Sequence, residues 1–206
     1  MEIIRDIDKI NIEPCVATIG FFDGVHQGHR FLINQIKAVA RAKGLRSALV
    51  TFSAHPRKVM QKDYQPQLLS TPKEKGVDYC IVLDFTPEIA RLTACEFMED
   101  ILKKKLNVAS LVIGYDHRFG HNRAEGFDDY YQYGTKIGME VLRAKACIIN
   151  DVNVSSSVIR LLLQEGEIDM ATKCLGYNYY LDGTVVDGYK VGRTIGFPTA
   201  NLKVED

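Results

Sequence analysis

The sequence predicts an α/β protein built on an open parallel β-sheet. Short apolar runs rich in Val, Ile and Leu recur along the chain, and they do not alternate cleanly with polar residues. That pattern is typical of parallel strands that are covered on both faces. Stretches with helical spacing separate the runs, which favours strand–helix–strand units with right-handed crossovers. The predicted strands are 16–19, 47–52, 79–83, 110–115 and 140–142.

The composition is that of an ordinary globular chain of 206 residues, with 26 basic and 26 acidic side chains. A net charge of zero argues against nucleic acid or a membrane surface as a partner, so any anion binding must be local. No apolar run approaches the length of a transmembrane helix. The five cysteines are widely spaced and form no C-x-x-C pair, which predicts reduced thiols in a cytoplasmic protein.

The most informative stretch follows the first predicted strand and precedes a predicted helix over 31–42. Residues 20–29 read Gly-Phe-Phe-Asp-Gly-Val-His-Gln-Gly-His. A turn between a strand and a helix presents free backbone N–H groups and the positive end of a helix dipole, which suits phosphate. Gly28 permits close backbone approach, and His26 and His29 can stabilise a phosphoryl group in transfer. The alternative is an ordinary turn with two exposed histidines.

The other three histidines also follow predicted strands. His55 comes after the second strand, and His117 and His121 come after the fourth. Ligands bind outside the carboxyl ends of parallel strands, so we expect all five histidines to line one cleft. Zinc is not favoured, because Gly120 indicates a loop and no third ligand cluster is evident.

The predicted helices carry recognisable ends. Residues 93–96, Thr-Ala-Cys-Glu, fit a capping box, and the lysines at 103–105 would close that helix. The serines at 155–157 precede an apolar run and predict another helix N-terminus. They serve either as a simple cap or, together with Arg160, as a polyphosphate site.

The last residues differ in character from the rest of the chain. Residues 179–188 alternate like a β-hairpin, and residues 192–201 read as a loop marked by Gly and Pro. So short a segment cannot form a stable core alone. We therefore expect one domain over 1–178 and, over 179–206, the beginning of a second domain that is cut off or not included.

Taken together, these motifs resemble those of the bifunctional bacterial FAD synthetases, which carry an FMN adenylyltransferase domain and then a riboflavin kinase domain. The likeness covers nearly the whole chain and includes the H-x-G-H signature of nucleotidyltransferases. It rests on G-F-F-D-G-V-H-Q-G-H, T-F-S-A-H-P-R, G-Y-D-H-R-F-G, V-S-S-S-V-I-R and G-R-T-I-G-F-P-T-A-N, in the family's order.

The resemblance implies a Rossmann-like nucleotidyltransferase domain with an open parallel sheet, followed by the start of a β-barrel riboflavin kinase domain. It also implies adenylyl transfer from ATP to FMN, giving FAD and pyrophosphate, with Mg²⁺ as cofactor. The full-length protein would also phosphorylate riboflavin, whereas we expect that this chain alone does not.

The resemblance further implies roles for individual residues. The groups that act on the phosphates of ATP would be His26, His29, Ser157 and Arg160. The turn that binds the adenylate side would consist of Gly20, Phe22, Asp23 and Gly24, with Gly28 beside it. The flavin would lie near Phe52, His55, Asp116 and Phe119. In the kinase segment, Thr199 and Asn201 of the P-T-A-N motif would help to bind Mg²⁺–ATP.

The chain departs from the usual family motifs at Phe21, Ser53–Ala54 and Val158, which bear on the detail of the flavin and phosphate contacts. Residues 71–76 are also too few for the helix that the family has there. A parallel crossover needs a dozen residues or more, so either the preceding stretch supplies it or a segment is missing from this numbering.

Two other functions remain open at this point. One is another H-x-G-H transferase, acting on pantetheine phosphate or a nicotinate nucleotide. The other is a nucleotide- or flavin-binding module without catalysis. The flavin-side motifs and P-T-A-N argue against the first, and the retained His26, His29 and Arg160 argue against the second.

Overall fold

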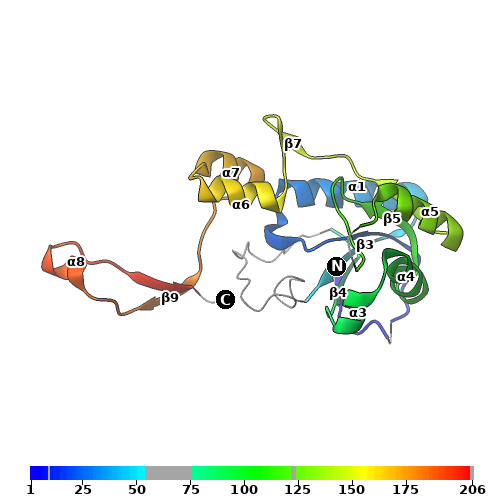
Figure 1. Cartoon of the computed structure of the whole chain (residues 1–206), viewed down its shortest axis with the longest axis horizontal. Coiled ribbons are helices and arrows are strands. Elements are labelled where there is room, and N and C mark those ends of the chain that lie inside the picture. The colour runs from blue at the N-terminus through cyan, green and yellow to red at the C-terminus, as the bar shows by residue number, and fades with distance from the viewer. Residues whose placement is uncertain (9, 54–75, 122–123, 205–206) are drawn as a thin grey trace.

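The fold is described from a computed structural model of the chain (Figure 1). The structure describes residues 1–8, 10–53, 76–121 and 124–204. His55 and the crossover question at 71–75 therefore lie outside the described residues. A layered α/β body makes up most of the molecule, and a C-terminal hairpin extends away from it (Figure 1).

The body is organised around a six-stranded sheet in which every neighbouring pair of strands is parallel. The strand order is β1-β4-β3-β2-β5-β6. The strands are β1 (Glu2–Ile4), β2 (Cys15–Ile19), β3 (Arg46–Phe52), β4 (Tyr79–Leu83), β5 (Val108–Ile113) and β6 (Glu140–Arg143). The predicted α/β class is confirmed, and all five predicted strands form. Within this sheet the strand that the sequence missed is β1, a short edge strand with one buried residue, Ile4.

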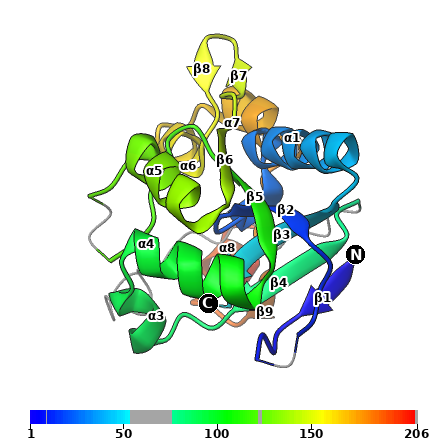
Figure 2. The same cartoon turned by 90° about the vertical axis from the view of Figure 1, so that its right-hand side faces the viewer.

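Both faces of this sheet are buried. Every residue of β2 is buried, and its side chains alternate between two hydrophobic clusters. Val16 packs with Ile33 and Ile36 of helix α1 (Gln27–Lys43) on one face, and Ala17 packs with Met98 on the other. Figure 2 shows α1 and α4 (Ala94–Glu96) on opposite sides of the strands. This two-sided burial explains why the strands read as continuous apolar runs.

The helices begin and end where their capping residues place them. Thr93 and Glu96 form the predicted capping box, and the helix that follows ends at the three lysines. Its second part is π-helical, with the Leu106 N–H donating to the Ile101 carbonyl. The helical elements are η1 (Asp23–Val25), α1 (Gln27–Lys43), α3 (Pro87–Arg91), α4 (Ala94–Glu96), η2 (Phe97–Lys105), α5 (Phe127–Ile137), α6 (Ser156–Gln164), α7 (Ile168–Leu175) and α8 (Val191–Thr194).

The order in which successive strands join the sheet reverses at β2. Strands β3 and β4 lie on one side of β2, whereas β5 and β6 lie on the other. Ligand sites of open α/β sheets form outside the carboxyl ends of the strands at such a switch point. A small hairpin, β7 (Ile148–Ile149) with β8 (Val152–Asn153), follows β6 and leads to α6.

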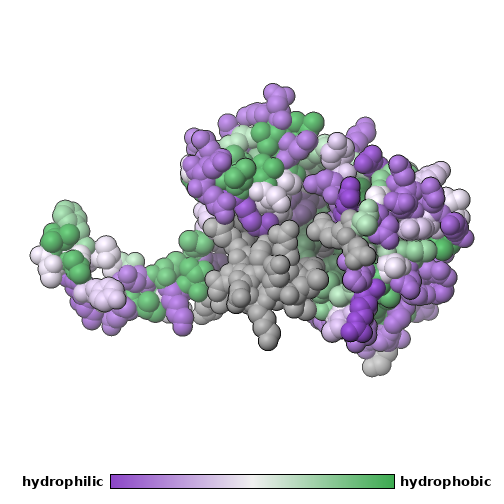
Figure 3. All heavy atoms as spheres, viewed as in Figure 1, coloured by the Kyte–Doolittle hydropathy of each residue, from purple (hydrophilic) through white to green (hydrophobic). Residues whose placement is uncertain are grey.

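The C-terminal segment differs from its predicted form. Strand β9 (Gly183–Val186) pairs with β10 (Asn201–Val204), so residues 179–188 supply one strand and not a complete hairpin. The Gly- and Pro-marked stretch forms the connection, and the second strand begins only at Asn201. Hydrophobic side chains lie exposed along this segment (Figure 3). The boundary between 178 and 179 and the start of a barrel stay predictions.

The packing of α5 against β6 yields a test of the fold. A Cβ on Gly134 would lie 2.5 Å from the Met139 carbonyl oxygen and from Val141 Cγ2. Alanine in place of glycine ordinarily stabilises a helix by about 1 kcal/mol. At this position we expect Gly134→Ala to destabilise the protein by about 1–3 kcal/mol, because the new methyl group overpacks the contact. Urea unfolding measures this.

Gln132→Ala is the matched control, because Gln132 is exposed on the same helix. Its effect should stay within about 0.5 kcal/mol. A gain in stability for Gly134→Ala would contradict the packing described here.

Candidate active site

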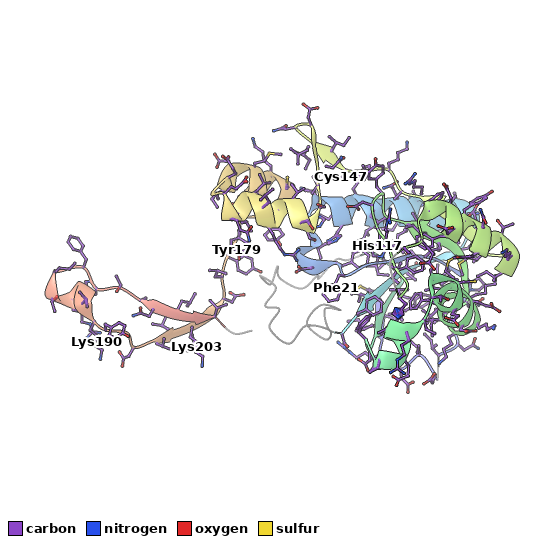
Figure 4. The ribbon with its side chains drawn as sticks, viewed as in Figure 1. Phe21, His117, Cys147, Tyr179, Lys190 and Lys203 are labelled. Atoms are coloured by element: carbon purple, nitrogen blue, oxygen red, sulfur yellow. The ribbon has the colours of Figure 1, made fainter. Side chains whose placement is uncertain are left out.

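A cavity of about 730 Å³ opens beyond the carboxyl ends of the central strands. Four of the five histidines line it, namely His26, His29, His117 and His121, as the strand-exit argument predicts. Phe21 and His117, labelled in Figure 4, come from two different strand exits and both reach this wall. The shared cleft is therefore present in the described part of the chain.

Most of the residues singled out by the sequence lie together on the cavity wall. They are Gly20, Phe22, Asp23, His26, Gly28, His29, Phe52, Asp116, Phe119, Ser157 and Arg160. Gly24 is buried and does not line the cavity; its carbonyl accepts a hydrogen bond from the Tyr177 hydroxyl at 2.7 Å. Thr199 and Asn201 line a separate cavity of about 320 Å³ on the C-terminal hairpin.

The turn between β2 and α1 has an unusual backbone. Phe22 and Val25 adopt φ angles of 41° and 35°, and Gly24 between them adopts 69°. Left-handed backbone costs a residue other than glycine about 1–3 kcal/mol, and a β-branched residue tolerates it poorly. Burial of Phe22 and Val25 against α1 holds the turn in place. The turn delivers His26 to the first position before the helix.

His26 makes two hydrogen bonds that fix its protonation. Its Nδ1 accepts the backbone N–H of His29 at 3.3 Å, and its Nε2 lies 3.0 Å from the Ser156 hydroxyl oxygen. A backbone N–H can only donate, so the neutral ring carries its proton on Nε2 and donates it to Ser156. Burial, aided by the charge of Arg160, lowers the pKa of His26 to about 4. The ring is therefore neutral at pH 7.

His29 stacks on His26, with ring centroids 3.6 Å apart and planes 22° apart. Burial, together with the neighbouring His26 and His117, holds the pKa of His29 well below its usual value. Its Nδ1 is buried and has no hydrogen-bond partner among the described residues. A buried polar atom of this kind is costly, and a ligand that bonded to it would remove the cost.

The three consecutive serines do three different things. Ser155 caps α6, because its hydroxyl oxygen accepts the Val158 N–H at 3.3 Å. Ser156 bonds to His26, and Ser157 is exposed and lines the cavity. The serine cluster is thus both a helix cap and part of the cavity wall. No local pattern favours Ser156 over its two neighbours, since its partner lies 130 positions away.

Arg160 and Asp23 join the two walls of the cavity. Arg160 Nη2 lies 2.5 Å from Asp23 Oδ2, with the side chains 21% and 10% exposed. This ion pair connects α6 to η1. Arg160 Nε is buried without a hydrogen-bond partner among the described residues. The guanidinium therefore keeps a donor that an anion in the cavity could use.

Gly28 lets the chain before α6 approach the first turn of α1. A Cβ at this position would lie 2.7 Å from the Val154 carbonyl oxygen and 3.1 Å from His26 Cε1. The glycine is needed for this close approach, as the sequence predicts.

The wall beyond β3 and β4 is apolar. Phe52 meets Phe85 edge to face, with centroids 5.5 Å apart, and Ile89, Leu92 and Phe97 continue this wall. Sequence reasoning missed Phe85, Ile89 and Leu92. The signal for them was their position directly after β4, at the same edge of the sheet as the histidines.

Phe119 is 8% exposed and held by the core. It stacks on Tyr130 at 4.3 Å between centroids, and its backbone N–H donates to the Tyr130 hydroxyl oxygen at 3.1 Å. The Tyr130 hydroxyl in turn lies 3.0 Å from the Glu125 carbonyl, to which it can donate. Tyr130 therefore fixes the loop that carries Asp116 and His117 along the cavity.

Within the described residues, no group of three or more His, Cys, Asp or Glu side chains is placed to hold a metal ion. In the same part of the chain, no helix has the length and apolar character needed to cross a membrane.

The buried histidines make stability depend on pH. The pKa of His26 is about 4 in the folded state and about 6.5 when unfolded, so protons favour the unfolded chain. Its contribution is present above pH 6.5 and is lost as the pH falls through 4. We expect the free energy of unfolding to drop by up to about 3 kcal/mol between pH 6.5 and 4, measured by urea unfolding.

His26→Asn is the comparison variant, because Asn keeps an acceptor at the helix N-cap but does not titrate. Its stability should fall less steeply over the same window. Equal slopes for the two proteins would show that His26 is not the group responsible.

Comparison with known proteins assigns the chain to a family. A sequence model of FAD synthetase matches residues 8–158, and one of riboflavin kinase matches residues 175–206. The bifunctional riboflavin kinase/FMN adenylyltransferase of Escherichia coli K12 is 35% identical over 212 residues, covering 98% of this chain and 68% of that protein. The protein of the same name from Listeria monocytogenes is 37% identical over 199 residues, covering 93% and 63%.

A solved structure agrees with this assignment in its fold. It is described as a macrolide-efflux protein from Streptococcus pneumoniae, and it matches with a TM-score of 0.77 at 32% identity, covering 99% of this chain and 69% of that one. The parallel sheet, the histidine-bearing turn and these matches together show that the chain belongs to the FAD synthetase family.

Proposed function

We propose that the α/β body transfers the adenylyl group of ATP to FMN, giving FAD and pyrophosphate. The observation that carries this proposal is the pair of stacked, neutral histidines at a helix N-terminus, on the wall of a cavity of about 730 Å³. The names of the bifunctional relatives include this activity, FMN adenylyltransferase, together with a second one, riboflavin kinase.

The reaction asks the protein mainly for positioning and charge stabilisation. A phosphate oxygen of FMN attacks the α-phosphorus of ATP, a new P–O bond forms, and the bond to pyrophosphate breaks with its electrons on the leaving oxygen. Holding the two phosphates in line removes much of the entropic barrier. Hydrogen-bond donors aimed at the oxygens where negative charge develops lower the remaining part of the activation barrier.

His29 is the donor closest to this role. Its Nδ1 is buried and has no hydrogen-bond partner among the described residues, so an N–H there is free to donate to a phosphoryl oxygen. Its depressed pKa keeps it neutral near pH 7, and a neutral imidazole can still donate one hydrogen bond.

Ser156 completes the donor set, with His26 behind it. Because His26 donates to the Ser156 oxygen, the hydroxyl hydrogen of Ser156 is left to point at a phosphate. In this proposal His26 acts through Ser156. Ser157 and the first amides of α6 hold the other phosphates, and Arg160 offsets the charge that grows on pyrophosphate.

Mg²⁺ is proposed to enter together with ATP. Protein sites usually bind it through one or two carboxylates plus substrate phosphates, rather than in an all-protein cage. Asp23, which pairs with Arg160 on this wall, is the carboxylate that would help to hold the ion. When bound, the ion would supply further neutralisation of the triphosphate.

The flavin is proposed to lie against the apolar wall of Phe52, Phe85 and Phe97, with Asp116 and Phe119 at its margin. The three fused rings of the isoalloxazine are large, flat and mostly apolar, which suits this wall. His55 keeps its expected flavin-side role as a prediction.

The C-terminal segment is proposed to belong to the riboflavin kinase activity, with Thr199 and Asn201 contributing to Mg²⁺–ATP binding. We expect no riboflavin phosphorylation by these 206 residues, because two short strands and one helical turn, with no buried residue among them, fall short of a stable core. We place the reaction in the cytoplasm, a proposal that the five free cysteines support.

The first test is synthesis of FAD by the purified chain from FMN, ATP and Mg²⁺, followed by chromatography. We expect FAD and pyrophosphate from FMN, and no FAD from riboflavin. His29→Ala should lower turnover by about 10²-fold or more, because one donor at the developing charge is lost.

Ser110→Ala serves as the control for this loss. It removes a buried serine that bonds to Glu140 and does not line the cavity, so turnover should stay near that of the parent. Failure to make FAD, with ATP still bound, would favour a binding module. Transfer to a different phosphate acceptor would favour another H-x-G-H transferase.

The proposed relay through Ser156 predicts coupling between two variants. Ser156→Ala and His26→Ala should each reduce kcat, and the double variant should lose little more than the worse single one. Residues that act through one contact are strongly non-additive. A Ser156→Thr variant, which keeps the hydroxyl, should recover most of the activity.

Additive losses in this cycle would mean that His26 and Ser156 act independently. A further readout is the ¹⁵N chemical shift of His26. We expect it to report a proton on Nε2 in the parent at pH 7.

A further inference from the structure

Tyr115 stands out among the residues of the cavity wall that the proposed function leaves without a role. It follows directly after the exit of β5 and lines the cavity, yet it is 55% exposed. More than half of the surface of this residue is therefore open to a ligand rather than used for packing.

The ring is nevertheless held in place from outside the cavity. The guanidinium carbon of Arg143 lies 5.6 Å from the centroid of the Tyr115 ring and 5.2 Å from that of Phe127. Arg143 is the last residue of β6 and pairs in register with Ile113 at the end of β5. A cation over an aromatic ring at this distance is attractive, so Arg143 braces Tyr115.

A second fixed surface lies near the same strand ends. The backbone of Lys145 is clamped by Gln35 of α1, which accepts the Lys145 N–H at 2.9 Å and donates to the Lys145 carbonyl at 3.3 Å. Residues 144–147 line the cavity, as Tyr115 does. Because β5 and β6 are neighbouring strands, their exits contribute an aromatic ring and a fixed stretch of backbone to one side of the cavity, the β5–β6 side.

The chemistry of FAD decides which ring belongs in this arm. FAD joins adenosine and riboflavin through two phosphates, so the two ring systems lie on either side of the phosphate site. The apolar wall suited to the flavin lies beyond β3 and β4, and β2 separates it from β5 and β6 in the sheet. The β5–β6 side of the cavity, which carries Tyr115, is left for the adenine.

We propose that Tyr115, braced by Arg143, is the stacking platform for the adenine ring of ATP. The proposal rests on the proposed function, because it takes ATP as the substrate of this cavity. Any planar base can stack on an aromatic side chain, whereas a triphosphate without a base gains nothing from it.

The test is calorimetric binding of two ligands to the full chain. For Tyr115→Ala we expect the Kd for ATP to rise about tenfold, as is typical for loss of one stacked base. The Kd for inorganic tripolyphosphate should not change. Tyr115→Phe should bind ATP as the parent does, and Arg143→Met should show a smaller rise in the same direction.

Tyr131→Ala is the matched control, because Tyr131 is 56% exposed on α5 and does not line the cavity. An equal loss of ATP and tripolyphosphate binding in Tyr115→Ala would overturn the proposal. So would unchanged ATP binding, with or without a rise in the KM for FMN. A parent chain that binds ATP but makes no FAD would instead sink the proposed function and leave the stacking result interpretable.

Discussion

The site depends on the left-handed backbone of the turn between β2 and α1. Positive φ angles at Phe22, Gly24 and Val25 turn the chain so that His26 becomes the cap of α1. In that position the amide of His29 occupies His26 Nδ1, which forces the proton onto Nε2. The same turn places Asp23 opposite Arg160. This locally unfavourable backbone conformation therefore determines which nitrogen of His26 carries the proton. It also positions Asp23 for its ion pair with Arg160 on the opposite wall.

Much of the fold was predictable because the decisive signals are local. Continuous apolar runs located the five long strands, and the box of Thr93 and Glu96 located a helix start. The prediction that strand-exit histidines share a cleft needed only the geometry of parallel sheets. Helix α1 begins earlier than its apolar spacing indicated, at Gln27 instead of 31, because a histidine caps it in place of the usual Ser, Thr, Asp or Asn.

The parts that escaped prediction depend on contacts between distant positions. Nothing local distinguishes Ser156 from its two serine neighbours, and only the approach of α6 to α1 selects it. Phe119 lines the cavity, but nothing local in the sequence shows that Tyr130, 11 positions away, stacks on it and holds it in place. Residues 179–188 carried the alternation of a hairpin, yet the partner strand lies beyond a helical turn, at 201–204. Periodicity reveals which face is buried and leaves the identity of the partner open.

Gly28 has a consequence for how this site can change in evolution. The group that excludes a side chain there is a backbone carbonyl, that of Val154, which every amino acid at position 154 would carry. No compensating replacement of a neighbouring side chain can therefore make room. Only a shift of the chain before α6 would do so, and it would draw Ser156 away from His26. The residue at position 28 and the distance between α1 and α6 therefore depend on each other, so neither can change without a change in the other.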